Sequence, residues 1–243
     1  MRMVRIYQPG PYAPGELLEL SPSASQHVGV VLRMQPGHLL TLFCGDNRAF
    51  TATISVVLKK RVVVHIDSVT TVNRESPCAL HLGQGIAKGD RMEWIIQKAI
   101  ELGVASISPL LTQHGAVKHD ATRLLKKHAQ WEAIAISACE QSGRNTVPLI
   151  HEPCSLSVYL DRCSVIQCKW ILDPQTTASW RDNIHPSAEI ALLVGPEGGF
   201  HASEVEQALV AQFKQIAIGP RILRTETASI AALSVLQAIA GDL

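Results

Sequence analysis

The first 72 residues alternate between short apolar runs and polar turns, as in a β-rich domain. Alternating or β-branched residues predict strands over residues 38–44, 49–58 and 61–69, because such side chains suit a half-buried pleated surface. The polar stretches GDNR and KKR that separate these runs fit hairpin turns. Several short strands at this spacing indicate a small barrel.

One segment of this part has helical spacing instead. Between residues 25 and 34, Val28, Val31 and Leu32 recur on one face of a helix. After the last strand, residues 70–78 are polar and without periodicity, as in a connection between domains. We therefore predict a β-rich domain over residues 1–72 and a second domain over 73–243.

In the second domain the pattern changes to alternating strands and helices. Apolar runs predict strands over residues 79–86, 104–111, 165–172, 190–194 and 214–219. Periodicity predicts helices within residues 88–103 and over 121–141 and 226–240. Asp90 can cap the first of them, and Gly103 can end it in a left-handed conformation. The alternation predicts an α/β fold with helices on both faces of a parallel sheet.

Two strands of this domain run into the same dipeptide, Gly195-Pro196 after the first and Gly219-Pro220 after the second. The stretch between them is helical and makes the pair a β-α-β unit, whose strands should be parallel and are candidates for neighbouring positions. Both loops then emerge at the carboxyl edge of the sheet, where α/β proteins bind ligands. We expect the loops to form one pocket wall, the alternative being two tight turns without a ligand.

The helix between the two loops has a start signal, and so has the final helix. Ser203 and Glu206 have the spacing of a capping box. Thr225 can cap the final helix, whose positive end would then face the pocket. Nearby Arg224 suits a phosphate or a developing negative charge. An Arg224–Glu226 surface pair around a helix cap is the simpler alternative.

The chemistry of the first loop limits its ligand. Gly198 and Gly199 allow a ligand to approach the backbone closely, and exposed peptide groups can read an adenine edge. The stretch lacks the Gly-Lys-Ser/Thr of a phosphate-binding P-loop and the G-x-G-x-x-G of a dinucleotide loop. The loop therefore matches neither of these two phosphate-binding motifs.

Composition narrows the class of protein. The 243 residues are 47% hydrophobic and 18% charged, as in soluble globular proteins, and no apolar run is long enough to span a membrane. The start of the chain lacks the apolar core of a signal peptide, so we expect a cytoplasmic protein. Neither the six cysteines nor the ten histidines have a metal-binding spacing, and we assign no metal and expect reduced thiols.

Charge is spread unevenly along the chain. Residues 1–72 carry seven Lys or Arg against four Asp or Glu, a net +3, whereas residues 73–243 carry 15 against 17, a net −2. This asymmetry hints at an anionic partner for the first domain, although a solvated face gives the same count.

The loop sequences LLVGPEGGF and GPRILRTETA resemble the signatures of the RsmE-type family of small-subunit ribosomal RNA uridine-N3 methyltransferases, within the SPOUT superfamily. The stretches KGDRMEWIIQKAIELGV, EQSGRNTVP and HVGVVLRMQPG are similar to the family as well, so the resemblance touches most of the chain. It implies a PUA-like N-terminal β-barrel that helps to bind RNA, an α/β domain with a C-terminal trefoil knot, and a homodimer. The implied cofactor is S-adenosylmethionine, and the implied partner is 16S ribosomal RNA or the small ribosomal subunit.

The resemblance also implies site residues. The cofactor would be lined by Leu172, Gly195, Gly199, Ile218, Gly219 and Leu223, together with the loop residues Pro196, Glu197, Gly198 and Pro220. Arg224 and Glu226 fall nearest the transferred methyl group. Where family members commonly carry an acidic-Arg-Ser stretch, this chain has Gln113-His114-Gly115, so no role is carried over to that loop.

The implied reaction is an in-line transfer of methyl to N3 of an unpaired or flipped-out uridine. We expect Arg224 to stabilise the charge left when N3 loses its proton. Glu226 is the weaker candidate, for removing that proton, because it could be only an ion-pair partner. Candidate phosphate contacts are Arg5, Arg33, Lys88 and Arg91, each of which could also be a solvated charge.

Two other functions are weighed against this one. A related methyltransferase could act on tRNA or on a ribose hydroxyl, but the N-terminal domain and RILRTETA argue against it. An RNA-binding assembly factor could carry an inactive knot, but the intact glycines of both loops argue against that.

Overall fold

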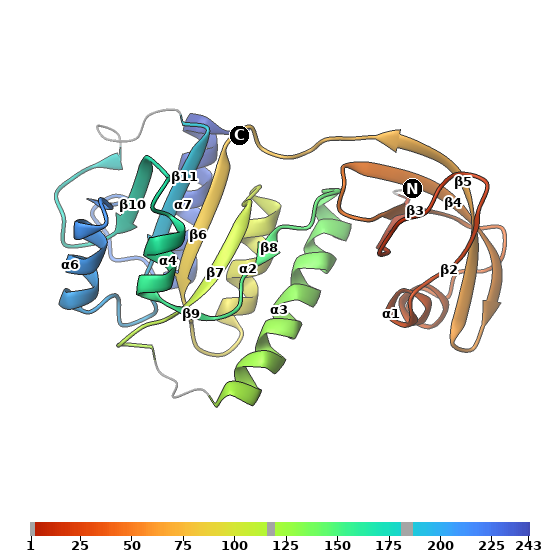
Figure 1. Ribbon diagram of the computed structural model, residues 1–243, viewed down its shortest axis with the longest axis horizontal. Helices are drawn as coiled ribbons and strands as arrows, with labels where there is room; N and C mark the ends of the chain where they lie inside the picture. Colours follow the sequence, from red (N-terminus) through yellow and green to blue (C-terminus); the bar gives the residue numbers. More distant parts are fainter. Residues whose placement is uncertain (1–2, 116–119, 181–186) are drawn as a thin grey trace. The chain divides into compact units, whose positions relative to one another are not determined.

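The computed structural model describes residues 3–115, 120–180 and 187–243, and its chain forms two compact units (Figure 1). One consists of Met1–Glu75 with Cys139–Val147, the other of Ser76–Ala138 with Pro148–Leu243. The division predicted at residue 72 lies close to the first change of unit. It did not anticipate that residues 139–147 belong to the N-terminal unit, because local periodicity carries no signal of distant contacts.

The N-terminal unit is built on one five-stranded sheet. Its strands are β1 (Val4–Tyr7), β2 (Leu17–Glu19), β3 (Leu39–Phe43), β4 (Arg48–Leu58) and β5 (Arg61–Thr71). The order is β1-β3-β4-β5-β2, and only the β1–β3 pairing is parallel. Buried side chains such as Leu42, Phe50 and Val64 form its core. Within the described residues, β1 and β2 are short edge strands with one partner each, so the sheet stays open and the predicted barrel does not close.

The predicted helix of this unit is shorter and less regular than expected. It consists of α1 (Pro22–Gln26), capped by Ser21, and a π-helical turn η1 (His27–Val31). Val28 is fully buried, but Val31 and Leu32 are 62% and 39% exposed. The predicted apolar face is therefore wrong for those two residues, because i→i+5 bonding shifts side chains away from the 3.6-residue positions.

The segment Cys139–Val147 is bound to the N-terminal unit through buried polar contacts. Arg5 donates to the backbone oxygen of Arg144 (3.0 Å) and to Oδ1 of Asn145 (2.6 Å). The Arg144 side chain, only 5% exposed, forms an ion pair with Glu75. Since a buried charge is costly unless it is paired, these contacts fix the returning segment in the unit.

The C-terminal unit contains a seven-stranded sheet. Its strands are β6 (Ala79–Gly85), β7 (Ser106–Leu111), β8 (Leu149–Ile150), β9 (Cys154–Ser155), β10 (Cys168–Leu172), β11 (Glu189–Val194) and β12 (Lys214–Ile216). The order is β12-β10-β11-β6-β7-β8, with β9 also on β7, and every pairing is parallel, as predicted. The strands β11 and β12 are parallel but not neighbours, because β10 lies between them.

Helices cover both faces of this sheet. They are α2 (Arg91–Glu101), α3 (Ala121–Ser142), α4 (Leu156–Arg162), α6 (Ala202–Val210) and α7 (Thr225–Ala240). The pair α2 and α7 packs together on one face, and α4 and α6 lie on the other (Figure 1). Among the described helices, none combines the length and the apolar character needed to cross a membrane. All six cysteines are free thiols.

The helix caps differ in part from the predicted ones. Asp90 precedes α2 without a side-chain capping bond, while Gly103 follows it in the expected left-handed conformation, at a φ of 79°. The capping box of α6 is formed by His201 and Glu204, because the imidazole accepts a backbone N–H and Glu204 accepts from the His201 backbone. The predicted box two residues later is therefore wrong.

Candidate functional site

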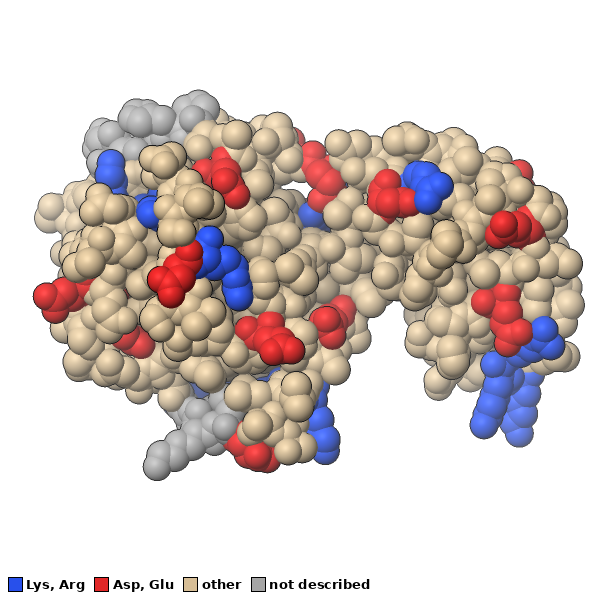
Figure 2. Space-filling model, in the orientation of Figure 1, with Lys and Arg blue, Asp and Glu red and all other residues tan. Residues whose placement is uncertain are grey.

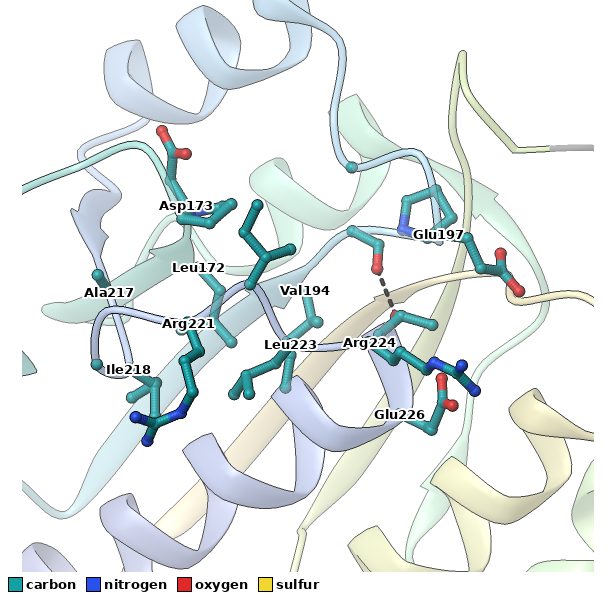
Figure 3. Close-up of a pocket in the computed structure, with 18 of the residues that line it drawn as sticks. Leu172, Asp173, Val194, Glu197, Ala217, Ile218, Arg221, Leu223, Arg224 and Glu226 are labelled. Atoms are coloured by element: carbon teal, nitrogen blue, oxygen red, sulfur yellow. Dashed lines mark hydrogen bonds between the residues drawn. The ribbon is translucent and has the colours of Figure 1, made fainter.

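A cavity of about 510 Å³ lies at the carboxyl ends of β10, β11 and β12 (Figure 3). Its walls come from the loops that follow these strands and from the first turn of α7. Both Gly-Pro loops border it, which confirms that they form one pocket wall. Intervening β10 contributes a third loop, which begins with Asp173 and Pro174.

Most of the residues predicted from the sequence border this cavity. Those that line it are Leu172, Gly195, Pro196, Glu197, Gly199, Ile218, Gly219, Leu223, Arg224 and Glu226. Gly198 and Pro220 are not among the lining residues. In Figure 3, Ala217 and Ile218 lie at one end and Glu197 and Glu226 at the other, with Leu172, Val194 and Leu223 between them. Asp173 and Arg221 also lie toward the Ala217 end, so the cavity has an apolar middle with charged side chains on both sides; the end with Glu197 and Glu226 is called the charged end below.

Close backbone packing shapes the first loop. Gly199 closes a tight turn by donating its N–H to the oxygen of Pro196 (2.9 Å), at a φ of 68° that favours glycine. At the end of β6, a Cβ on Gly85 would lie 2.4 Å from Cδ of Pro196. The loop can therefore pass this strand end only because residue 85 has no side chain.

A buried polar network joins this loop to α7. Thr225 donates its hydroxyl to the backbone oxygen of Gly195 (2.6 Å), a bond drawn in Figure 3, and accepts from Nε2 of Gln84 (3.0 Å). Ser229 donates to Oε1 of Gln84 (2.5 Å). The predicted capping role of Thr225 is wrong, since Arg224 is the N-cap residue and the Thr225 hydroxyl is bound to the loop.

The charged end of the cavity is organised around Arg91. Its guanidinium forms an ion pair with Glu197 (2.7 Å) and lies 3.8 Å from Oε1 of Glu226. Burial would raise the pKa of Glu197, but hydrogen bonds from the Lys88 backbone and from Arg91 outweigh it and hold that pKa below its usual range. Glu197 is therefore ionised at neutral pH.

Glu226 differs from Glu197 in its surroundings. Its side chain is 14% exposed, and its Oε2 atom is buried with no hydrogen-bond partner among the residues that the structure describes. An unsatisfied buried carboxylate oxygen is costly and commonly marks a functional position. Glu226 thus places a largely buried carboxylate at the charged end of the cavity.

The four predicted phosphate contacts lie in different surroundings. Arg5 is engaged inside the N-terminal unit, and Arg91 lines the cavity. Arg33 and Lys88 are exposed. Basic side chains also gather at the tip of the β4–β5 hairpin (Figure 2), whose turn carries Lys59 and Lys60, two residues outside the predicted phosphate contacts.

The loop Gln113-His114-Gly115, which replaces the acidic-Arg-Ser stretch of the family, packs against the first Gly-Pro loop. Nδ1 of His114 donates to the backbone oxygen of Gly198 (3.0 Å), and a Cβ on Gly198 would lie 3.0 Å from Cβ of His114. The backbone N–H of Gln113 donates to Glu204 at the start of α6 (2.9 Å). The His114 ring also contacts that of His201, with centroids 5.5 Å apart. Gln113 and His114 therefore support the wall of the cavity from outside.

Sequence reasoning missed several lining residues. They are Asp173, Pro174, Val194, Ile216, Ala217, Ile222, Thr225 and Ala228. The signal that could have found Asp173 is its place directly after a predicted strand, at the same sheet edge as the two Gly-Pro loops.

Comparison with known proteins identifies relatives over the whole chain. A family model for an RNA methyltransferase domain matches residues 74–237. A ribosomal RNA small subunit methyltransferase E from Buchnera aphidicola is 36% identical, with 100% of this chain and 98% of the relative covered. The protein of the same name from Bacillus subtilis is 33% identical, with 86% and 85% covered.

Solved structures agree with these matches. A Legionella pneumophila protein described as a methyltransferase, in complex with bound cofactor SAM, is 53% identical with a TM-score of 0.97. A ribosomal RNA small subunit methyltransferase E from Neisseria gonorrhoeae, bound to S-adenosyl methionine, is 39% identical with a TM-score of 0.92. Both comparisons cover 100% of each chain.

Proposed function

Since this chain belongs to the RsmE-type family of ribosomal RNA small subunit methyltransferases, we propose that it transfers a methyl group from S-adenosylmethionine to N3 of a uridine in 16S ribosomal RNA. The observation that carries the proposal is the cavity formed by two Gly-Pro loops, with Arg224 and Glu226 at its edge. Relatives of high similarity that were solved with this cofactor support it.

The cavity suits S-adenosylmethionine in size and chemistry. Its volume lies within the usual range for small-molecule sites. The apolar side chains of Leu172, Val194 and Leu223 suit an adenosine, and the glycine-rich backbone offers peptide groups for its polar edge. The missing P-loop lysine is no obstacle, because this cofactor carries no phosphate. When bound, it supplies an electrophilic methyl group on a positively charged sulfur.

The residues at the charged end would act on the uridine. N3 must lose its proton before or during attack, and the negative charge that develops spreads over the uracil ring and its two oxygens. The exposed guanidinium of Arg224 can stabilise that charge. The carboxylate of Glu226, which lines the cavity, can accept the N3 proton.

We further propose the finer features that the family resemblance implies. The N-terminal unit would be a PUA-like RNA-binding module, supported by its net basic charge and its basic hairpin tip. The C-terminal unit would contain a trefoil knot, in the region where the chain passes from β11 through α6 to the far side of β10. The protein would be a cytoplasmic homodimer.

The decisive test of the function compares modified nucleosides in ribosomal RNA from cells with and without the protein. We expect one 3-methyluridine of the small-subunit RNA to disappear and to return when the gene is restored. An unchanged 3-methyluridine, with loss of a ribose-methylated or tRNA nucleoside instead, would contradict the assignment. Failure to bind S-adenosylmethionine at millimolar concentration in calorimetry would argue for an inactive assembly factor.

We expect His114→Ala to weaken cofactor binding by roughly threefold to tenfold, the range given by the loss of one hydrogen bond. The reason is that His114 donates a hydrogen bond to Gly198 in the first Gly-Pro loop, which borders the proposed cofactor cavity. Calorimetric titration with S-adenosylmethionine measures the effect. His65→Ala is the matched control, since it also removes one side-chain hydrogen bond of a histidine, to Asp67, but in the N-terminal unit. Equal affinities in the two variants would remove His114 from the support of the loop.

A further inference from the structure

We propose that a second cavity, next to the first, is the pocket that receives the target uracil. It has a volume of about 590 Å³, and its lining residues are Asp90, Arg91, Glu93, Trp94, Gln97, Ile134 and Glu226. Arg91 and Glu226 belong to both cavities. The inference rests on the proposed function, because it needs a methyl donor in the first cavity.

One face of α2 supplies most of this pocket. Arg91, Trp94 and Gln97 are three residues apart, so they follow one another along the exposed side of the helix. The opposite side of α2, including Ile95 and Ile96, is fully buried against the rest of the unit. The pocket is therefore built on a helix whose position is fixed by its buried face.

Trp94 gives the pocket a platform for a flat aromatic ring. Its side chain is large and apolar, yet 47% of it is exposed. Stacking on an aromatic side chain is a general way for proteins to hold an unpaired base, because every base has a π-face. An exposed indole in a cavity beside the proposed methyl-donor site suits a flipped-out base.

The polar groups of the pocket match the edge of uracil. That edge presents an N3–H donor between two carbonyl acceptors. The carboxylate of Glu226, which lines the pocket, can accept from N3, while Arg91 and the exposed Gln97 amide can donate to the carbonyl oxygens. Glu93 is less available, since it accepts a hydrogen bond from Gln130 (2.7 Å). Cytosine has an acceptor at N3 and would face the Glu226 carboxylate unfavourably.

The two residues shared by the cavities, Arg91 and Glu226, also determine where the base must lie relative to the methyl donor. A base whose N3 faces Glu226 lies at the boundary with the first cavity, where the methyl donor is proposed to bind. The electron pair of N3 forms the new bond to the methyl carbon. The carbon–sulfur bond breaks with its electron pair on sulfur, and the N3 proton passes to the carboxylate of Glu226.

The test compares Trp94→Ala with Trp94→Phe in methylation of small ribosomal subunits that lack the modification. We expect Trp94→Ala to lower kcat/KM for the subunit by about 10- to 100-fold, as for loss of one stacking platform, while S-adenosylmethionine affinity changes less than twofold. Trp94→Phe should restore most of the activity, because it keeps an aromatic face. Val158→Ala, an exposed apolar residue of α4, is the control.

The outcomes separate this inference from the proposed function. If the unaltered protein forms no 3-methyluridine, the proposed function itself fails. If it does and Trp94→Ala matches it, the uracil pocket is overturned. The pocket is also overturned if Trp94→Ala loses activity only because its sedimentation changes to that of a smaller species, since a second copy of the chain would then cover α2.

Discussion

Replacing Arg224 by alanine is expected to lower the turnover of ribosomal RNA methylation by about 10²- to 10³-fold, the effect of removing one donor that stabilises developing charge. Arg224 is exposed at the edge of the cavity, and Figure 3 shows its side chain at the same end as Glu226. It is the N-cap residue of α7 but makes no side-chain capping bond, so the variant should fold normally. S-adenosylmethionine affinity should stay close to normal, because the cofactor would be held chiefly by the loops.

Single-turnover methylation assays and calorimetry together measure this separation of chemistry from binding. Arg224→Lys should recover part of the rate, since it keeps the charge but loses the planar guanidinium. Arg123→Ala, an exposed arginine on α3, is the control for a general loss of positive charge. Unchanged turnover in Arg224→Ala would exclude Arg224 from the mechanism.

Gly85→Ala should weaken S-adenosylmethionine binding by at least about tenfold, although residue 85 does not line the cavity. A new Cβ would lie 2.4 Å from Cδ of Pro196 and 2.5 Å from its backbone nitrogen. A proline ring cannot rotate out of the way, so the first Gly-Pro loop itself must shift. Small displacements of a binding group can lower the affinity for a ligand by large factors. Overpacking should also lower the free energy of unfolding by about 1–3 kcal/mol.

Calorimetric titration and thermal unfolding test the two parts of this expectation separately. Gly29→Ala is the matched control, because a Cβ there would meet only side-chain carbons at 3.4 Å, which is ordinary contact. If Gly85→Ala binds the cofactor as tightly as the unaltered protein, the β6 end does not position the loop.

The pattern of apolar residues predicted the longer elements well, because each carries its own periodicity. The strands β4, β5 and β11 and the helix α3 lie within a residue or two of their predicted ranges. Short strands such as β2 and β9 have too few residues to show a pattern and were missed. The placement of β10 between β11 and β12 was also missed, because strand order depends on a chain path that local sequence does not encode.

The candidate site also has a part that could be predicted from the sequence and a part that could not. Its loops could be found because glycine and proline mark a strand end, and the resemblance then pointed to Arg224 and Glu226. The role of Arg91 in the cavity wall could not be found, since it depends on α2 and α7 lying side by side. Nor does the sequence around Trp94 distinguish an exposed indole in a cavity from an ordinary buried one.

The return of residues 139–147 to the N-terminal unit sets an order of events during protein synthesis. Residues 1–75 leave the ribosome first, but the partners of Arg5 emerge only after the intervening residues 76–138. Glu75 likewise can form its ion pair with Arg144 only after residue 144 has been synthesised. Although N-terminal domains usually fold first, this one can complete its buried contacts only after more than half of the chain has been translated.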